Sequence, residues 1–522
     1  MSNVLETLIK YFPSGRAETE KDFLGDVFVL PGKFTEMITP AERSCRILVG
    51  KKGSGKSALL NVLIDNSNRA GIPSILIKPD DISEFFEVGA KDLGSMKRGY
   101  YNALIYSIGI KIGEHLSGFL SESDNNLLQM AIDKGVKSRD GIKKILSILM
   151  PVGKAVSNVD FKSILPSNVP NTRVLSDNIK ERLGSDNHIF FLGIDDTDQI
   201  ANPGEDFFLE KIWAIILAAQ KVAEEIPHIK PIISLRWEIW SRLTSDDHGA
   251  RDQIDHFRPM VRDLNPTNEE LGEILDRRLD IAVKNIRPKQ SDSYNTFFEG
   301  KSVTLPFSKE TRDWKTFIVT SSRFRPRDTV QFVNSLASFS IESGKGKIAQ
   351  DIVDVSSLKY SKERVEDLVN ENEYVCKQLE VILKSFHKCD FEMDTETVKT
   401  HIHNLTGLGL IKVSKSVVKQ TDESSIFALW KLLYDIEFLT PRMPDVRKVR
   451  GFRHISPRHD KNLVDPSRWT DMQKCAWDIH PAYRSFLIEV KKSEEMMALA
   501  REKEKTSDES GYKAGAIRKN RR

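Results

Sequence analysis

The chain has 522 residues, of which 39% are hydrophobic and 29% are charged, and its formal net charge is +3. A chain of this length predicts about three domains, each able to bury its own core. The hydrophobic content excludes a wholly disordered protein, and 78 Lys and Arg against 75 Asp and Glu exclude a uniformly polybasic nucleic-acid binder. The positive surplus falls in residues 491–522, which carry ten basic and six acidic residues.

The cysteines predict neither a disulfide framework nor a zinc site, because no two of the four are spaced as in a CxxC motif. Isolated thiols favour a reducing compartment. The N-terminal residues lack the apolar core of a signal peptide, and the longest apolar run, 212–219, is shorter than the ~20 residues that span a bilayer. We therefore expect a cytoplasmic protein with no membrane partner.

Four short apolar runs predict strands that are buried on both faces of a parallel sheet, because they are continuous rather than alternating. The first run, 46–49, ends at Gly50, and an apolar helical pattern follows from Ala58. The other runs are 72–77, 189–194 and 231–235. Helical patterns at 97–116 and 207–225 lie between them. Strands that alternate with helices predict a doubly wound α/β fold.

The segment that follows the first strand reads GKKGSGKS and fits the pattern G-x-x-x-x-G-K-[ST] at every fixed position. Backbone N–H groups of such a loop surround phosphate oxygens, and the N-terminus of the next helix attracts the same anions. We expect Lys56 to reach the β and γ phosphates of ATP and Ser57 to ligate Mg²⁺. The residues expected to bind the nucleotide are Gly50, Lys51, Lys52, Gly53, Ser54, Gly55, Lys56 and Ser57.

Two carboxylates, Asp195 and Asp196, follow the apolar strand 189–194. Ligands of open α/β sheets bind at the carboxyl ends of the strands, so this strand can bring a carboxylate beside the glycine-rich loop. We expect Asp195 to hold Mg²⁺ with Ser57, directly or through water. Asp196 would orient or deprotonate the attacking water, and Asp198 competes with it for that role. The alternative is that these acids only form a turn or cap the next helix.

Arginines near two further elements are candidates for sensing the γ-phosphate. Arg236 ends the strand 231–235, where its guanidinium could contact the phosphate or the partner acid; the alternative is a solvated strand end. Arg327 follows Pro326 at the start of a helix and could reach the nucleotide from a lid, or else pair with Asp328. Candidates for acting on a neighbouring subunit's nucleotide are Arg251, Arg258 and Arg262.

Together these motifs resemble the AAA+/STAND superfamily of P-loop ATPases, nearest its origin-recognition-like and bacterial conflict-system branches. The resemblance covers about residues 20–345 and is carried by GKKGSGKS, FFLGIDDTDQI, IISLRWEIW and RFRPRD. It implies a P-loop ATPase in which Arg236 corresponds to sensor 1 and Arg327 to sensor 2. Asp196 stands where many members carry Glu, so slow turnover is expected.

The expected domains follow from these patterns and from the resemblance. They are a P-loop core over 1–240 with a helical insertion at about 119–185, a helical lid over 241–345, a winged-helix-like domain over 346–490 and a disordered tail over 491–522. Thr267 and Glu270 predict the capped start of a lid helix, and 346–365 predicts a linker. Helices at 375–386 and 393–405, followed by a strand, are similar to a winged helix.

The favoured function is an ATP-binding and ATP-hydrolysing molecular switch in a bacterial defence or regulatory assembly, with a protein partner or a second copy of the chain. The alternative is a DNA-binding ATPase of the loader or initiator kind. It would use the basic segment 441–462, which has seven Lys and Arg against two Asp and contains Phe452, His454 and His459. That segment could instead be a solvated or partner-facing loop. A phosphotransferase that acts on a small acceptor is the third possibility.

Overall fold

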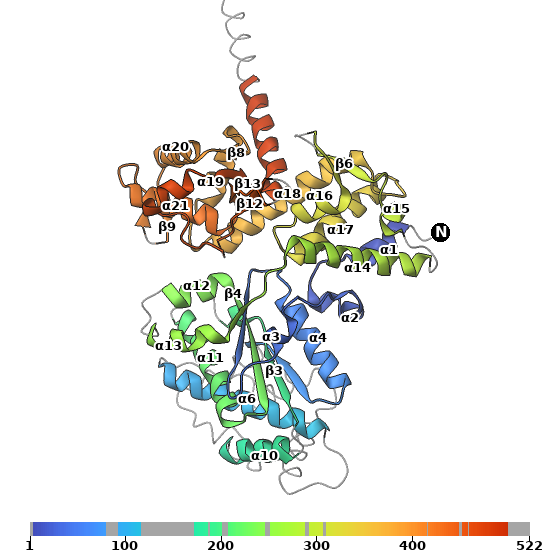
Figure 1. The fold of residues 1–522 in the computed structure, drawn as a ribbon, viewed down its shortest axis with the longest axis vertical. Helices are drawn as coiled ribbons and strands as arrows, with labels where there is room; N and C mark the ends of the chain where they lie inside the picture. The colour runs from blue at the N-terminus through green and yellow to red at the C-terminus, as the bar shows by residue number, and fades with distance from the viewer. Residues whose placement is uncertain are drawn as a thin grey trace, which may run out of the picture. The chain divides into compact units, whose positions relative to one another are not determined.

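The computed structural model of the chain divides into two compact units (Figure 1). The sheet unit comprises Pro13–Ile281 and Phe324–Arg327, and the C-terminal unit comprises Met1–Phe12, Ala282–Arg323 and Asp328–Arg522. The residues that the structure describes are 4–79, 92–115, 172–185, 188–200, 207–245, 251–287, 292–305, 309–414, 416–447, 451–457 and 459–499.

The sheet unit contains a five-stranded parallel sheet in the order β2-β3-β4-β1-β5. The strands are β1 (Arg46–Gly50), β2 (Ser74–Ile77), β3 (Phe190–Ile194), β4 (Ile229–Arg236) and β5 (Val261–Asp263). Each of the four apolar runs in the sequence forms a strand, and the α/β prediction is confirmed. Because β4 lies between β1 and β3, their carboxyl ends meet at one edge, with Gly50 in register with Arg236.

Helices cover both faces of this sheet, so that successive β1 side chains enter different cores. Ile47 and Val49 belong to the larger core, with α6 (Leu93–His115) and α11 (Phe208–Glu225), whereas Leu48 packs with α4 (Lys56–Arg69) (Figure 1). All three side chains are fully buried. This two-sided burial explains why the strand is continuously apolar.

Shorter elements complete the sheet unit and carry its loops. They are η1 (Ala17–Thr19), α2 (Leu24–Val27), α3 (Phe34–Ile38), α10 (Thr172–Ser185), η3 (Thr197–Gln199), α12 (Trp237–Ser245), α13 (Arg251–Phe257), η4 (Arg258–Met260) and most of α14 (Asn268–Ile286). Within the expected insertion, α10 is helical, and the preceding residues 116–171 lie outside the described part of the chain.

The expected start of a lid helix at Thr267 is confirmed in α14. The Thr267 N–H donates to Glu270 Oε2 at 2.8 Å, and the Glu270 N–H donates to Thr267 Oγ1 at 3.2 Å. These reciprocal bonds satisfy two N–H groups that the first helical turn leaves without intrahelical partners. The helix expected after Arg325 also forms, as α17 (Pro326–Glu342).

The predicted linker over 346–365 is wrong, because α18 (Gln350–Asn372) occupies most of it. Buried positions of α18 include Ser356, Ser357, Ser361 and Arg364. These polar residues interrupt the apolar periodicity that would have indicated a buried helix. The rest of this part of the C-terminal unit consists of α1 (Val4–Tyr11), α15 (Ser293–Phe297), β6 (Ser302–Thr304), β7 (Thr311–Asp313) and α16 (Trp314–Thr320).

The remainder of the C-terminal unit has the element order expected of a winged helix, three helices combined with a small antiparallel sheet. The helices are α19 (Leu379–Ser385), α20 (Thr395–Leu405) and α21 (Glu423–Asp435). The sheet has the order β12-β11-β13-β8, formed by Phe452–His454, Leu439–Pro444, Ala476–Ile479 and Glu392–Met393. The minor elements are η5 (Phe386–Lys388), η6 (Thr406–Leu408), β9 (Lys412–Val413), β10 (Ser416–Val417), η7 (Pro466–Arg468) and α22 (Trp469–Met472).

A helix over 481–499 follows β13, so the expectation of a disordered tail is wrong for residues 491–499. The remaining tail residues, 500–522, lie outside the described part of the chain. Among the described helices, none combines the length and hydropathy needed to cross a membrane. The expected domain boundaries stay a prediction.

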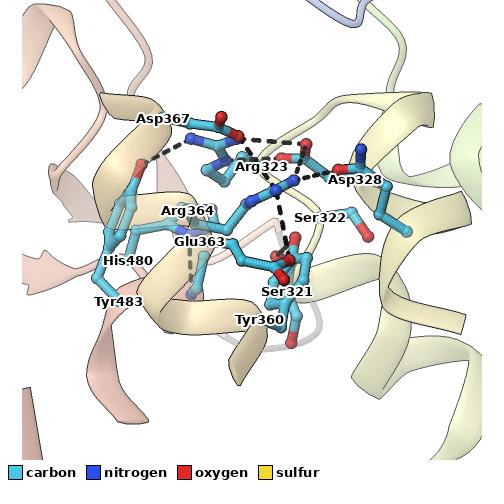
Figure 2. A network of polar contacts seen from close by, with 12 residues as sticks. Ser321, Ser322, Arg323, Asp328, Tyr360, Glu363, Arg364, Asp367, His480 and Tyr483 are labelled. Carbon is cyan, nitrogen blue, oxygen red and sulfur yellow. Dashed lines mark hydrogen bonds and ion pairs between the residues drawn. The ribbon is translucent and has the colours of Figure 1, made fainter. Parts of the chain in front are cut away.

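A buried polar network connects three segments of the C-terminal unit (Figure 2). Asp328 accepts from Arg323 Nε at 2.6 Å and from Arg364 Nη1 at 3.0 Å, and all three side chains are nearly inaccessible to solvent. Arg323 also donates to the Tyr483 hydroxyl at 3.3 Å, and Arg364 contacts Asp367 at 3.1 Å. Burial alone would lower the pKa of Arg323, but the Asp328 carboxylate outweighs this effect and raises it.

We predict that Asp328→Asn strongly destabilises the protein, because it leaves two buried guanidinium groups facing a neutral side chain. Removing one partner of a buried ion pair costs about 3 to 5 kcal/mol. Urea unfolding followed by tryptophan fluorescence measures the shift. The control is Asp351→Asn at the exposed Lys345–Asp351 pair, for which we expect a change below about 1 kcal/mol. Equal shifts for the two variants would contradict the assigned role of Asp328.

Candidate functional site

The glycine-rich loop joins β1 to α4, and its glycines are required by close contacts and by backbone conformation. A Cβ atom at Gly50 would lie 2.5 Å from Ser54 Oγ and 2.7 Å from the Leu264 carbonyl oxygen. Gly53 and Gly55 have φ values of +81° and +101°, which L residues rarely adopt. The loop therefore turns tightly into the first turn of α4, where N–H groups are available to an anion.

Lys56, the first residue of α4, is folded back onto this loop. Its Nζ donates to the carbonyl oxygens of Gly50 at 2.8 Å and Lys51 at 3.1 Å. Burial lowers the pKa of Lys56 to about 8, and Glu238 is the side chain that most opposes this shift. The loop thus holds a buried amine beside the positions where phosphate oxygens would bind.

Asp195 directly follows β3 and is 1% exposed. Its Oδ1 accepts from the Ser234 hydroxyl at 2.5 Å, whereas its buried Oδ2 has no hydrogen-bond partner among the described residues. Burial and the neighbouring Asp196 raise the pKa of Asp195, and the hydroxyls of Ser234 and Ser57 oppose this shift. The structure therefore brings Ser57 and Asp195 together, as the sequence predicts.

These two residues fit a magnesium ion, because an orphaned buried carboxylate oxygen beside a hydroxyl offers oxygen ligands of the kind that Mg²⁺ prefers. Among the described residues, no group of three or more His, Cys, Asp or Glu could hold a metal by itself. Mg²⁺ is commonly bound through one or two protein ligands and completes its shell with water and phosphate oxygens. Ser57 and Asp195 supply such a partial set.

Asp196 is held by an ion pair that the sequence did not indicate. It adopts a left-handed backbone conformation with φ +51°, and its Oδ2 accepts from Lys78 Nζ at 2.7 Å. Lys78 follows β2 and also contacts Glu18 at 3.0 Å. These hydrogen bonds outweigh the effect of burial and raise the pKa of Lys78 above its usual range. Asp196 thus lies at the expected edge with its carboxylate engaged.

Arg236 lies at the same edge, where its Nη2 forms an ion pair with Asp198 Oδ2 at 2.6 Å. The guanidinium thus has a carboxylate partner at this strand end, and its contact with the γ-phosphate stays a prediction. The pair also engages Asp198, the competitor of Asp196. The preceding turn is fixed by Thr197, whose buried hydroxyl donates to the Ser234 carbonyl oxygen at 2.8 Å.

Arg327 contacts the glycine-rich loop directly within the sheet unit. Its backbone N–H donates to the Gly53 carbonyl oxygen at 3.4 Å, and its Nε donates to the Gly15 carbonyl oxygen at 3.3 Å. A Cβ at Gly53 would lie 3.0 Å from Arg327 Cβ. Asp328, the alternative partner considered for Arg327, binds Arg323 and Arg364.

The arginines considered for a neighbouring subunit's nucleotide are described only in part. Arg258 forms an exposed pair with Asp255 at 3.1 Å, and Arg262 lies 3.7 Å from Glu36. The side chain of Arg251 lies outside the described residues. Their action on a second subunit stays a prediction.

Sequence reasoning missed three polar residues at this edge, and each had a local signal. Lys78 follows the end of β2 as Asp195 follows the end of β3, so the same rule for strand ends applies to it. Ser234 is the polar residue within the buried stretch 231–235 of β4, whose other residues are apolar. Glu238 comes two residues after the end of β4, in the first turn of α12.

The basic segment 441–462 is partly neutralised by pairs within the C-terminal unit. Arg442 pairs with Glu392 and lies 3.6 Å from Asp478, and its guanidinium lies 4.6 Å from the centre of the Phe452 ring. Arg447 pairs with Asp445 at 3.0 Å. Residues 448–450 and 458 lie outside the described part. DNA binding through this segment stays a prediction of the sequence.

Comparison with known proteins places a local family match on the helical part of the chain. A family model described as the FunZ-associated C-terminal helical domain matches residues 269–369. The matched region runs from α14 into α18 and includes the whole segment 346–365 that had been expected to be a linker. No curated protein matches the chain.

Solved structures similar to the chain include two ORC proteins and a CDC6P protein. The Aeropyrum pernix ORC2 protein in its ADPNP-ADP complexes is 10% identical, covers 92% of this chain and 94% of its own, and has a TM-score of 0.37. CDC6P from Pyrobaculum aerophilum is 12% identical, and the match covers 93% of this chain and 98% of CDC6P, with a TM-score of 0.30. The Aeropyrum pernix ORC1 protein in complex with DNA is 12% identical, with coverages of 89% and 97% and a TM-score of 0.33. Similarity at this level transfers no function.

The buried Lys56 predicts a pH dependence of nucleotide binding. The ammonium form binds phosphate, and its pKa of about 8 in the free protein means that binding at higher pH requires uptake of a proton. By linkage, the affinity for a non-hydrolysable ATP analogue falls about tenfold between pH 7.5 and pH 9. Titration calorimetry in two buffers of different ionisation enthalpy measures the proton uptake. Binding at pH 9 without proton uptake would contradict the prediction.

Proposed function

We propose that the chain is a P-loop ATPase of the AAA+ type that acts as an ATP-binding and ATP-hydrolysing molecular switch. The observation that supports it most is the arrangement at the carboxyl edge of the sheet. There the glycine-rich loop, the amine of Lys56 and the pair of Ser57 and Asp195 come together, with Asp195 Oδ2 buried and unpartnered. Such a set of groups matches the requirements of a magnesium-bound triphosphate.

Each residue has a distinct role in the proposed hydrolysis. The loop 50–57 binds the phosphates through its N–H groups, and Lys56 neutralises charge on the β and γ phosphates. Ser57 and Asp195 would hold Mg²⁺, which would further neutralise the charge that develops as the bond breaks. Asp196 orients or deprotonates the attacking water, which requires its carboxylate to separate from Lys78.

Two arginines would report the state of the nucleotide. Arg236 would exchange its partner Asp198 for the γ-phosphate, because a guanidinium binds either oxyanion in the same geometry. Arg327, whose backbone already contacts Gly53, would follow any movement of the loop. Binding and hydrolysis would thereby select between two arrangements of the lid and core.

The proposed setting is a bacterial defence or regulatory assembly, and the proposed partner is another protein or a second copy of the chain. The family resemblance carried by the four motifs is the support for this setting. DNA is a further possible partner, through the basic segment 441–462.

We predict that Lys56→Ala weakens ATP binding at least about 30-fold. The variant removes the charged donor from a buried site, and losses of 2 to 5 kcal/mol are typical for such groups. Calorimetry with magnesium and a non-hydrolysable analogue measures the affinity. The matched control is Lys33→Ala at an exposed position of the sheet unit, which should bind as the wild type does. Equal affinity in the wild type and Lys56→Ala would overturn the proposed function.

We predict that Asp196→Asn binds ATP within about threefold of the wild type but hydrolyses it at least about tenfold more slowly. Its carboxylate lies outside the set of groups expected to contact phosphate, so its loss should affect the water and not the affinity. Steady-state release of phosphate, measured with the affinity, separates the two effects. An unchanged kcat would remove Asp196 from the mechanism.

A further inference from the structure

Among the described residues, four carboxylates follow the ends of β3 and β4, namely Asp195, Asp196, Asp198 and Glu238, and the first three are already engaged. Asp195 faces Ser57 and Ser234, as expected of a metal ligand. Asp196 is bound by Lys78 at 2.7 Å, so its charge is balanced by a cation. In the same way, Arg236 balances Asp198 at 2.6 Å. A general base needs an oxygen able to accept a proton from water, and a carboxylate in an ion pair is a poorer acceptor.

Glu238 differs from Asp196 and Asp198, which are held by cations, and it shares with the expected metal ligand Asp195 a buried carboxylate oxygen without a hydrogen-bond partner among the described residues. Its Oε2 is buried and has no hydrogen-bond partner among the described residues. A buried polar atom without a partner costs roughly 1 to 3 kcal/mol, so such atoms are rare unless they serve a ligand or a reaction. An apolar residue in the first turn of α12 would avoid this cost.

The position of Glu238 is set by the sheet. β4 ends at Arg236, which is in register with Gly50 of the glycine-rich loop, and α12 begins at the next residue. Glu238 exerts the strongest electrostatic effect of any side chain on the Lys56 amine, ahead of Asp195 and Asp198. The register of Arg236 with Gly50 and the start of α12 at the next residue place Glu238 at the same edge of the sheet as the glycine-rich loop.

We propose that Glu238 is the general base of the hydrolysis, an inference that rests on the proposed ATPase function. Asp196, held by Lys78, then orients the attacking water and does not accept its proton. The alternative explanation, that Glu238 only balances the charge of Lys56, predicts loss of nucleotide affinity when the carboxylate is neutralised.

The proposed step balances in atoms and charge. The water oxygen forms a bond to the γ-phosphorus while the bond from that phosphorus to the β-γ bridging oxygen breaks. The bridging oxygen keeps the electron pair and leaves as part of ADP. The proton lost by the water passes to Glu238, which later releases it to solvent, and the other product is inorganic phosphate.

The test compares Glu238→Gln, Glu238→Asp and Asp196→Asn with the wild type at pH 7, which is below the pKa of about 8 that Lys56 has in the wild type. ATP affinity and kcat are measured for each. We expect Glu238→Gln to bind ATP within about threefold of the wild type and to lose at least about 100-fold in kcat. Glu238→Asp should recover part of the rate, because a shorter carboxylate can still accept the proton. The matched control is Glu269→Gln, an exposed glutamate in the first turn of α14.

Three results would overturn the assignment. The first is a kcat of Glu238→Gln within threefold of the wild type, and the second is a larger loss of kcat in Asp196→Asn than in Glu238→Gln. The third is a loss of ATP affinity together with the loss of kcat in Glu238→Gln. If Glu238→Gln does not fold, the test uses Glu238→Asp by itself, and a kcat of Glu238→Asp equal to that of the wild type overturns the assignment. Failure of the proposed function looks different. In that case the wild type releases no phosphate, or it binds ATP no better than Lys56→Ala, and the assignment of Glu238 fails with it.

Discussion

A buried amine on a tight glycine-rich loop is the constraint on which the rest of the candidate site depends. Lys56 is held by two loop carbonyl oxygens, and burial lowers its pKa to about 8. A cation removed from water is stable only where acids compensate it. The strand order supplies them, because β3 and β4 end beside the loop with Asp195 and, two residues into α12, Glu238.

Ion pairs separate the acids that follow β3 into two groups, those that face hydroxyl groups and those that face cations. Hydroxyl groups surround Asp195, whereas cations hold Asp196 and Asp198. A carboxylate that faces hydroxyls remains available to a metal, and one that faces a cation has its charge satisfied within the protein. In the proposed function, the carboxyl edge of the sheet would therefore bind magnesium and position water without each acid competing for both tasks.

Much of the sheet unit could be predicted from sequence, because its signals are local. The glycine spacing, the apolar strands and the acids after β3 each occupy a few consecutive residues. The contacts of Lys78 and Ser234 were missed because they join residues more than 35 positions apart, Lys78 with Asp196 and Ser234 with Asp195. The helical spacing of apolar residues did not predict α18, because its buried face includes serines and Arg364, which Asp328 binds.

A structure of the chain with magnesium and a non-hydrolysable ATP analogue tests the central claim most directly. We expect Mg²⁺ about 2.1 Å from Ser57 Oγ, with Asp195 as a direct or water-mediated ligand. Lys56 Nζ should leave the carbonyl oxygens of Gly50 and Lys51 for the phosphates. A nucleotide bound elsewhere, or phosphates in the loop with Lys56 still on those carbonyl oxygens, would contradict the claim.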